Sequence, residues 1–345
     1  MEFNICYFHC IDSLTQIVLG AAVGEVLVGR KVGNKGALWG AVCGTIPDLD
    51  FVFGAFLNDV DKNIFHRSVS HSLLFFVLAA PVTGWLIHKI HNTLAVGWKE
   101  WSWMAFWAYF THALLDCFTT WGTQIFWPIT TKIAFKSVFV IDPIYTIPLI
   151  VCLVLALRLH RNHRKRKLWA WLGIGISSVY LIFTLIAKYS AEQYFYQLIK
   201  SKKISYLHME TKPTPFNAVL WAATIETKEG YYMGYHSFFD AGDAPLQYFP
   251  KNEHLLSVFT DEKTKQKLMG LTEGWYTVEQ NGEVLYLNDL RFGTLSGWEE
   301  GGAFVFSYEI KEEEGKWVVK ERKKRLKQPP SQILGNLWSR VCGNY

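Results

Sequence analysis

The 345-residue sequence lacks the motifs of several large enzyme classes. It has no G-x-S-x-G nucleophile elbow, no Walker phosphate-binding loop and no H-E-x-x-H pair. Ser70-His71-Ser72 does not form a catalytic triad either, because adjacent residues of a helix do not face one another. Any chemistry must therefore reside in other residues.

Cysteine pairs and a signal peptide are also missing. The six cysteines show no metal-binding spacing, and three lie in apolar runs, where cysteine behaves as a small hydrophobic residue. We infer no disulfide framework. Residues 1–11 have neither a basic n-region nor a cleavage motif, and translation could begin at Ile11 instead. The net charge of +5 comes from local clusters, so we expect no nucleic-acid partner.

Apolar residues are abundant but unevenly placed. Up to about Lys188 the chain is dominated by apolar runs, several of which approach the ~20 residues of a membrane-spanning helix. The last two runs are the clearest spans, whereas Gln16 and Glu25 weaken the first and Pro47 breaks the second, so these two could form a re-entrant or half-buried pair. The predicted segments are 14–28, 36–57, 72–88, 101–120, 139–157 and 168–187. We predict an α-helical membrane domain of about five to six helices over residues 12–188.

Basic residues predict the orientation of this domain. The connections around Arg30 to Lys35, Lys89 to Lys99, and Arg158 to Lys167 alternate correctly along the six segments. Short loops rich in Lys and Arg remain in the cytoplasm. We therefore expect a multi-pass protein of the bacterial inner membrane, with 48–71 and 119–138 on the extracytoplasmic side.

The pattern changes after a polar linker at 189–204, which could continue the last helix. Residues 205–325 alternate apolar and polar side chains between turns, and Asn281-Gly282 is a strong hairpin signal. We predict a small antiparallel β domain here, also extracytoplasmic, and a tail at 326–345. The basic stretch at the start of the tail is a solvated segment or a contact for anionic lipid headgroups.

Carboxylates and imidazoles interrupt the apolar regions at two places. Asp48 and Asp50 follow Pro47, and His66 and His71 follow shortly after. The two imidazoles converge most easily if His66 lies on a loop and His71 starts the next helix, capped by Ser68 or Ser70. Carboxylate oxygens and imidazole nitrogens are the usual ligands of zinc and similar divalent metals. A turn at the water interface, with structural histidines, is the alternative.

The second place is the pair His112 and Asp116, whose spacing of four residues puts both on one face of a helix. They could share the same metal, or form a hydrogen bond inside a helix bundle. Threonines could surround the ligands, and Arg67 carries a fixed cation suited to phosphate. The threonines are Thr111, Thr119 and Thr120.

Other polar residues in apolar surroundings have two interpretations each. Glu25 could pair with an Arg or Lys or belong to the site. Asp142 could take part in catalysis or, with Pro143 after it, simply cap a helix. The stretch Trp121–Trp127 is typical of an interfacial aromatic belt, with substrate stacking as the alternative.

These motifs together resemble a known family. DSLTQIVLGAAVGE, GTIPDLD, HRSVSHS, THALLDCFTTWGTQIFWP and VFVIDPIYT occur in the order found in the YdjM-like family of bacterial inner-membrane proteins. The resemblance covers about Asp12–Lys188 and implies a membrane-bound metal-dependent hydrolase, distantly similar to zinc-dependent phospholipase C. It also implies that His112 and Asp116 form a zinc-ligating pair. The sequence lacks that enzyme's N-terminal Trp ligand and a second His-x-x-x-Glu pair, so one or two metals are expected rather than three.

From these observations we expect a divalent metal, with zinc as the first choice, held by six side chains. A metal-activated water would attack a phosphoester or phospholipid-type substrate while Arg67 and Asp142 assist, and membrane lipids are the expected partners. Two alternatives are an ion-transporting protein and a non-catalytic protein with a structural metal. The sequence says nothing of the oligomeric state. The six expected ligands are Asp48, Asp50, His66, His71, His112 and Asp116.

Overall fold

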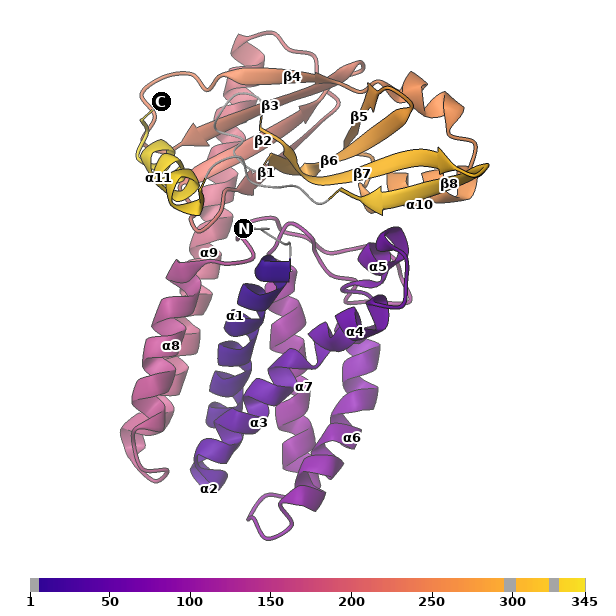
Figure 1. Ribbon diagram of the computed structural model, residues 1–345. Coiled ribbons are helices and arrows are strands. Elements are labelled where there is room, and N and C mark those ends of the chain that lie inside the picture. Colours follow the sequence, from indigo (N-terminus) through magenta and orange to yellow (C-terminus); the bar gives the residue numbers. More distant parts are fainter. Residues whose placement is uncertain (1–5, 295–301, 323–328, 345) are drawn as a thin grey trace.

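The computed structural model describes residues 6–294, 302–322 and 329–344, with side chains from residue 14 onward apart from Pro330. A bundle of helices forms the first part of the chain, and a β domain sits on one end of the bundle (Figure 1). This confirms the predicted order of a helical domain followed by an antiparallel β domain.

The helices follow the predicted apolar segments closely. The first segment is α1 (Cys6–Gly24) and a π-helical turn at Glu25–Gly29. The others are α2 (Arg30–Val32), α3 (Asn34–Thr45), α4 (Asp50–Gly54), α5 (Asp59–Phe65), α6 (Leu73–Ile90), α7 (Trp98–Asp116), α8 (Pro143–Leu157) and α9 (Arg164–Ser201). As predicted, Pro47 interrupts the second segment, where it opens a 3₁₀ turn at Pro47–Leu49. Helix α9 runs through most of the expected linker, which has no separate structure up to Ser201.

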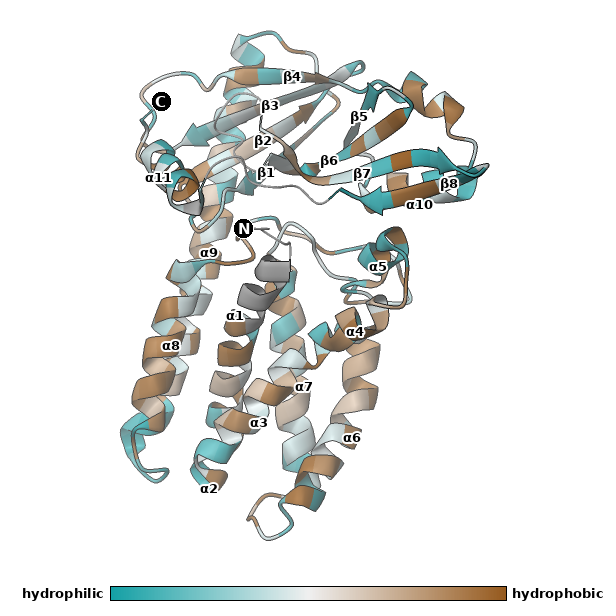
Figure 2. Cartoon of the chain, in the orientation of Figure 1, coloured by the Kyte–Doolittle hydropathy of each residue, from teal (hydrophilic) through white to brown (hydrophobic). Residues whose placement is uncertain are grey.

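Two helices of the described chain, α6 and α9, are long and apolar enough to cross a membrane. Helix α8, expected as one of the clearest spans, has only 15 residues, or about 22 Å. It is short because Asp142 caps it at one end and the basic connection begins directly after the other. These helices are nevertheless rich in hydrophobic residues (Figure 2), and Val179, Ile182 and Ile186 of α9 are each about 60% exposed or more.

Helices α1 and α3 approach each other more closely than any side chain would allow. A Cβ atom on Gly20 would lie 2.4 Å from the carbonyl oxygen of Gly40, and one on Gly24 would lie 2.1 Å from that of Gly36. Contacts below 3 Å to backbone atoms cannot be relieved by rotating a side chain. The glycines therefore fix the position of α1 against α3.

A buried ion pair joins α9 to the turn after α1. The Nε and Nη2 atoms of Arg166 donate to the two carboxylate oxygens of Glu25 at 2.5 and 2.6 Å, and both side chains are nearly inaccessible. Of the two roles considered for Glu25, the structure supports pairing. Arg166 also donates to the side-chain oxygen of Asn34 at 2.8 Å, which ties in α3.

We expect Arg166→Met to lower the free energy of unfolding by about 3–5 kcal/mol, because it leaves the Glu25 carboxylate buried without its partner. Adding Glu25→Leu should recover much of that loss, since an apolar pair needs no desolvation of charge. Denaturation of the purified variants in detergent measures both effects. A double variant less stable than Arg166→Met would contradict this account.

The β domain contains two four-stranded antiparallel sheets rather than one. The first consists of β1 (His208–Pro213), β2 (Leu220–Glu226), β3 (Gly230–Ser237) and β4 (Leu246–Pro250). The second consists of β5 (Tyr276–Asn281), β6 (Val284–Thr294), β7 (Phe304–Glu313) and β8 (Lys316–Glu321). The predicted hairpin at Asn281-Gly282 is confirmed: Asn281 pairs with Val284, and Gly282 has a φ of 63°. Helix α10 (Glu262–Leu271) precedes the second sheet, and α11 (Pro330–Val341) follows it.

The second sheet rests on the end of the helical bundle. Trp121, expected in an interfacial aromatic belt, is only 8% exposed and packs against Phe292 and Phe306. That expectation was wrong for Trp121, because the β domain rather than lipid covers its ring. Asp59 of α5 accepts a hydrogen bond from the backbone N–H of Glu321 in β8 at 3.0 Å, and Asn63 of α5 donates to Tyr308 Oη at 3.1 Å. The segments that carry the predicted site thus face the β domain (Figure 1).

Candidate metal centre

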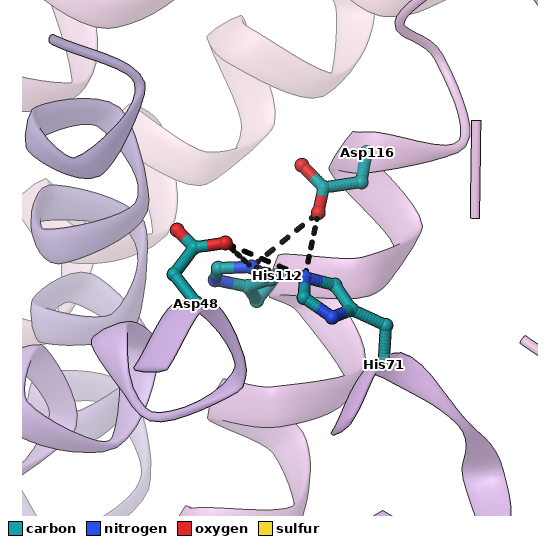
Figure 3. Close-up of side chains that lie close together, drawn as sticks. All are labelled: Asp48, His71, His112 and Asp116. Carbon is teal, nitrogen blue, oxygen red and sulfur yellow. Dashed lines mark hydrogen bonds and ion pairs between the residues drawn. The ribbon is translucent and has the colours of Figure 1, made fainter. Parts of the chain in front are cut away.

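Four side chains from three separated parts of the chain converge at the end of the bundle near the β domain. They are Asp48 from the 3₁₀ turn after α3, His71 from the turn before α6, and His112 and Asp116 from α7 (Figure 3). One donor atom of each lies within 4.8 Å of the other three. The predicted convergence of these four residues is therefore present in the fold.

The distances between these atoms suit a small divalent cation. The Nε2 atoms of His71 and His112 are 3.2 Å apart, and each lies 3.3–3.4 Å from Asp48 Oδ1 and Asp116 Oδ2. Four ligands placed tetrahedrally at about 2.0–2.1 Å from zinc lie about 3.3–3.4 Å from one another. Five of the six distances between pairs of donor atoms thus match a tetrahedral zinc site.

The hydrogen bonds of the two imidazoles leave their Nε2 atoms as acceptors. His112 Nδ1 is 2.6 Å from the carbonyl oxygen of Gly44, to which it must donate a proton. His71 Nδ1 lies 3.0 Å from Ser70 Oγ, which in turn donates to Asp50 Oδ2 at 3.3 Å. Such contacts fix the tautomer of metal-binding histidines. Two Nε2 lone pairs and two carboxylate oxygens then face one another, an arrangement that suits a bound cation.

The two oxygens of Asp116 have different surroundings. Oδ1 accepts a hydrogen bond from Gln16 Nε2 at 2.9 Å and lies 3.3 Å from Arg67 Nη2. Oδ2 is fully buried, and within the described chain no hydrogen bond reaches it. A buried carboxylate oxygen without a donor is costly. Oδ2 is the atom that points at the cluster, so the residues present fit a bound metal.

Arg67 lies outside the group of four donor atoms and contacts it through Asp116. It is 2% exposed, and its Nη1 donates to Thr119 Oγ1 at 2.6 Å while its backbone N–H donates to Asp50 Oδ2 at 2.9 Å. Its backbone is left-handed, with a φ of 59°, which is unusual for a residue with a side chain. The contacts hold Arg67 against the far side of Asp116, so it positions a ligand.

Asp50 and His66, also expected as ligands, lie outside the group of four. His66 Nδ1 is 3.1 Å from Asp50 Oδ1, and Asp50 Oδ2 is 3.7 Å from Nδ1 of His71, the ring nitrogen that faces away from the cluster. Burial alone would raise the pKa of Asp50, but the hydrogen bond and charge of His66 outweigh it and lower that pKa. Asp50 therefore supports His71 as a carboxylate behind the metal ligands does.

The remaining candidates are placed as follows. Asp142 caps α8, where it accepts hydrogen bonds from Ile144 N at 2.9 Å and from Tyr180 Oη at 2.7 Å. Of its two interpretations, the structure therefore supports helix capping. Ser72, rather than Ser68 or Ser70, caps α6, because the turn at Val69–His71 intervenes. Of the three threonines, Thr119 contacts Arg67, and Thr111 donates to its own helix.

Sequence reasoning missed Gln16 and the carbonyl of Gly44, which both contact the ligands. The available signal was Gln16 itself, a polar residue in the otherwise apolar helix α1, which packs against the glycines of α3. Because α1 and α3 touch through glycines, Gln16 can reach Asp116, and the last turn of α3 can reach His112.

We expect Gln16→Leu to weaken metal binding about 10–100-fold, the usual effect of losing an outer hydrogen bond to a ligand. Thr15→Val is the matched control, since Thr15 bonds Thr146 Oγ1 instead of a ligand. Titration of the metal-free proteins with zinc in the presence of a competing chelator measures the two affinities. Equal affinities for both variants would contradict the role given to Gln16.

The four ligands differ in their access to the surroundings. The side chains of His71, His112 and Asp116 are at most 1% exposed, whereas that of Asp48 is 18% exposed. Asp48 is therefore the member of the cluster that lies nearest to the surroundings.

Comparison with known proteins agrees with the motifs of the helical domain. No curated protein and no solved structure matches the chain. The family model described as "YdjM inner membrane protein" matches residues 11–191, which is slightly more than half of the sequence and includes all four clustered residues. The chain belongs to the YdjM inner membrane protein family.

Proposed function

We propose that this protein is a membrane-bound metal-dependent hydrolase with a zinc-type centre at Asp48, His71, His112 and Asp116. The observation that carries the proposal is a buried group of four facing acceptor atoms, one of which belongs to the partly exposed Asp48. Three ligands are closed off, and Asp48 is partly exposed, so water and a substrate can reach a cation held there.

The donor set supports zinc or a similar metal. Imidazole nitrogens are borderline donors and carboxylate oxygens are hard donors, and zinc accepts both. The distances of 3.2–3.4 Å between donor atoms suit metal–ligand bonds of about 2.0–2.1 Å. A bound divalent cation of this kind lowers the pKa of a water ligand towards about 7 and polarises a phosphoryl oxygen. The protein itself supplies orientation: Gly44 and Ser70 fix the imidazoles, while Gln16 and Arg67 fix Asp116.

We propose an amphipathic phosphoester, such as a phospholipid, as the substrate. Asp48 is followed directly by an apolar stretch whose side chains are exposed, including Leu49 at 46%, Phe53 at 67% and Phe56 at 86%. An exposed apolar surface of this size marks contact with a membrane or a hydrophobic ligand. A headgroup phosphate at Asp48 would leave acyl chains beside these residues.

We propose that the centre and the β domain lie on the extracytoplasmic side. All three basic connections are at the end of the bundle opposite the β domain (Figure 1), and loops of this kind remain in the cytoplasm. The family supports an inner-membrane location, and the exposed apolar faces of α6 and α9 are suited to lipid.

The test is metal-dependent turnover by the detergent-purified full chain. We expect hydrolysis of a phospholipid or a synthetic phosphodiester to stop after chelation and to return with added zinc. The His71→Ala variant should show no activity under any metal. Activity that persists in His71→Ala, or the absence of turnover across phosphoester and lipid substrates by a fully loaded protein, would refute the proposal.

A structural metal site is the second candidate, favoured by the completeness of the ligand set. Four protein ligands alone can fill a zinc tetrahedron, as structural sites do. X-ray absorption spectroscopy of the zinc-loaded protein separates the two: a fifth oxygen ligand supports the hydrolase, and a shell of two nitrogens and two oxygens supports the structural role.

A further inference from the structure

Helix α11 is held firmly on the β domain by one of its sides. Leu337 and Val341 are buried with Leu220 of β2. At the end of the helix, Arg340 Nη2 donates to Asp240 Oδ2 at 2.7 Å, and Ser237 Oγ donates to the carbonyl oxygen of Val341. These contacts fix which side of α11 faces away from the domain.

The neighbouring side of α11 exposes large apolar residues. Leu334 is 50% exposed and Trp338 is 68% exposed, and they lie one turn apart on a common face. Phe239, on the turn that packs against Gly343, is 66% exposed. No described residue covers Leu334 and Trp338, so this apolar face is turned outward.

The position of α11 relative to the helical bundle indicates what covers it. Phe216 packs against the cluster of Leu337 and Val341, and its ring is 5.7 Å from that of Phe139. Phe139 precedes Pro143, the first residue of α8, by only four positions. Helix α11 therefore lies about two side-chain layers above the start of α8, at the rim of the β domain (Figure 1).

The level of α11 along the helical bundle corresponds to the membrane surface. Helix α8 is about 22 Å long, whereas the hydrocarbon core of a bilayer is about 30 Å thick and the headgroups add to that. A bilayer around α8 must therefore extend past its ends, towards α11. Tryptophan is enriched at this interface, and amphipathic helices bury one apolar face in it.

We propose that the Leu334–Trp338 face of α11 rests in the headgroup region of the same phospholipid bilayer that holds the helical domain, and so anchors the β domain to the membrane surface. This proposal does not depend on the hydrolase activity.

The experiment uses the full chain with a single fluorescent probe. Trp338→Cys and Gln332→Cys are each made with Cys6, Cys10 and the exposed Cys342 replaced by Ser, and are labelled with an environment-sensitive fluorophore. Gln332 is exposed too but points about 120° away from Trp338 around the helix. The proteins are reconstituted into vesicles of phosphatidylcholine and phosphatidylglycerol, with or without a lipid that carries a shallow doxyl quencher.

We expect the quencher lipid to reduce emission from the probe at 338 and to leave the probe at 332 largely unaffected. Leu334→Cys should behave as Trp338→Cys does, which guards against an effect of one substitution on folding. Equal quenching at 332 and 338, or quenching of the 338 probe by aqueous iodide instead of lipid, would overturn the proposal. A probe at 338 that neither quencher reaches would mean that protein covers the face, and would overturn it as well.

Discussion

Purified His112→Ala and Asp116→Ala proteins should contain no more zinc than background, while remaining in the membrane fraction. Each variant removes one of four clustered donors, so a water would have to complete the tetrahedral shell, and we expect the zinc to be held too weakly to survive purification. Elemental analysis after detergent extraction measures the loss. His112→Ala is the cleaner variant, because Asp116→Ala also leaves the buried Arg67 without the carboxylate beside it.

A histidine outside the cluster provides the control. His66→Ala should retain the metal, because His66 contacts Asp50 rather than the facing donor atoms. His66 and His71 are only five residues apart, so sequence position alone would not separate them. Zinc content lost equally in His66→Ala and His71→Ala, or full occupancy in His112→Ala, would contradict the assigned ligand set.

We expect the second large effect, on stability and zinc affinity, from Gly40→Ala, which adds one methyl group. Gly40→Ala places a Cβ 2.2 Å from the carbonyl oxygen of Gly20 and 2.8 Å from the Cα of Gly24. Because both atoms belong to backbone, α1 and α3 must separate, at a cost at or above the roughly 1–3 kcal/mol of ordinary overpacking. Separation also moves Gln16 and Gly44 away from the metal ligands, so stability and zinc affinity should fall together.

Gly175→Ala is the matched control for this substitution. Gly175 also lies in a helix, α9, but a Cβ there meets nothing within 4 Å. This variant should be neutral or stabilised by up to about 1 kcal/mol, the helix propensity of Ala over Gly. Thermal unfolding of both proteins in the same detergent gives the comparison. A Gly40→Ala protein as stable as Gly175→Ala would show that the helices are not in such close contact.

The helical part of the fold was predictable because its apolar runs are long and their breaks are chemically distinct. Pro47 and the Asn281-Gly282 turn are local signals, and the structure places an interruption and a hairpin there. The division of the C-terminal part into two sheets was not predictable, because alternation of side chains does not specify which strands pair. Helix α11 was not predicted, because it is short and its few apolar residues are separated by polar ones.

The candidate site was predictable as a set of residues but not as a coordination shell. The spacing of His112 and Asp116 places them on one face of α7 whatever the rest of the fold does. Whether Asp48 or Asp50, and His66 or His71, faces them depends on one 3₁₀ turn and on the left-handed backbone of Arg67, which are properties of the tertiary structure. The supporting Gln16 comes from close contact between two helices, which no single segment encodes.

Helix α9 connects the helical domain to the β domain without a break. Its 38 residues form an unbroken rod about 57 Å long, which begins at the basic connection and ends inside the β domain. With Arg166 pinned to Glu25 near one end and Phe195 packed against β2 near the other, the rod has no joint about which the two domains could swing. A displacement of the β domain would therefore be transmitted along α9 to the basic connection at the opposite end of the helical bundle.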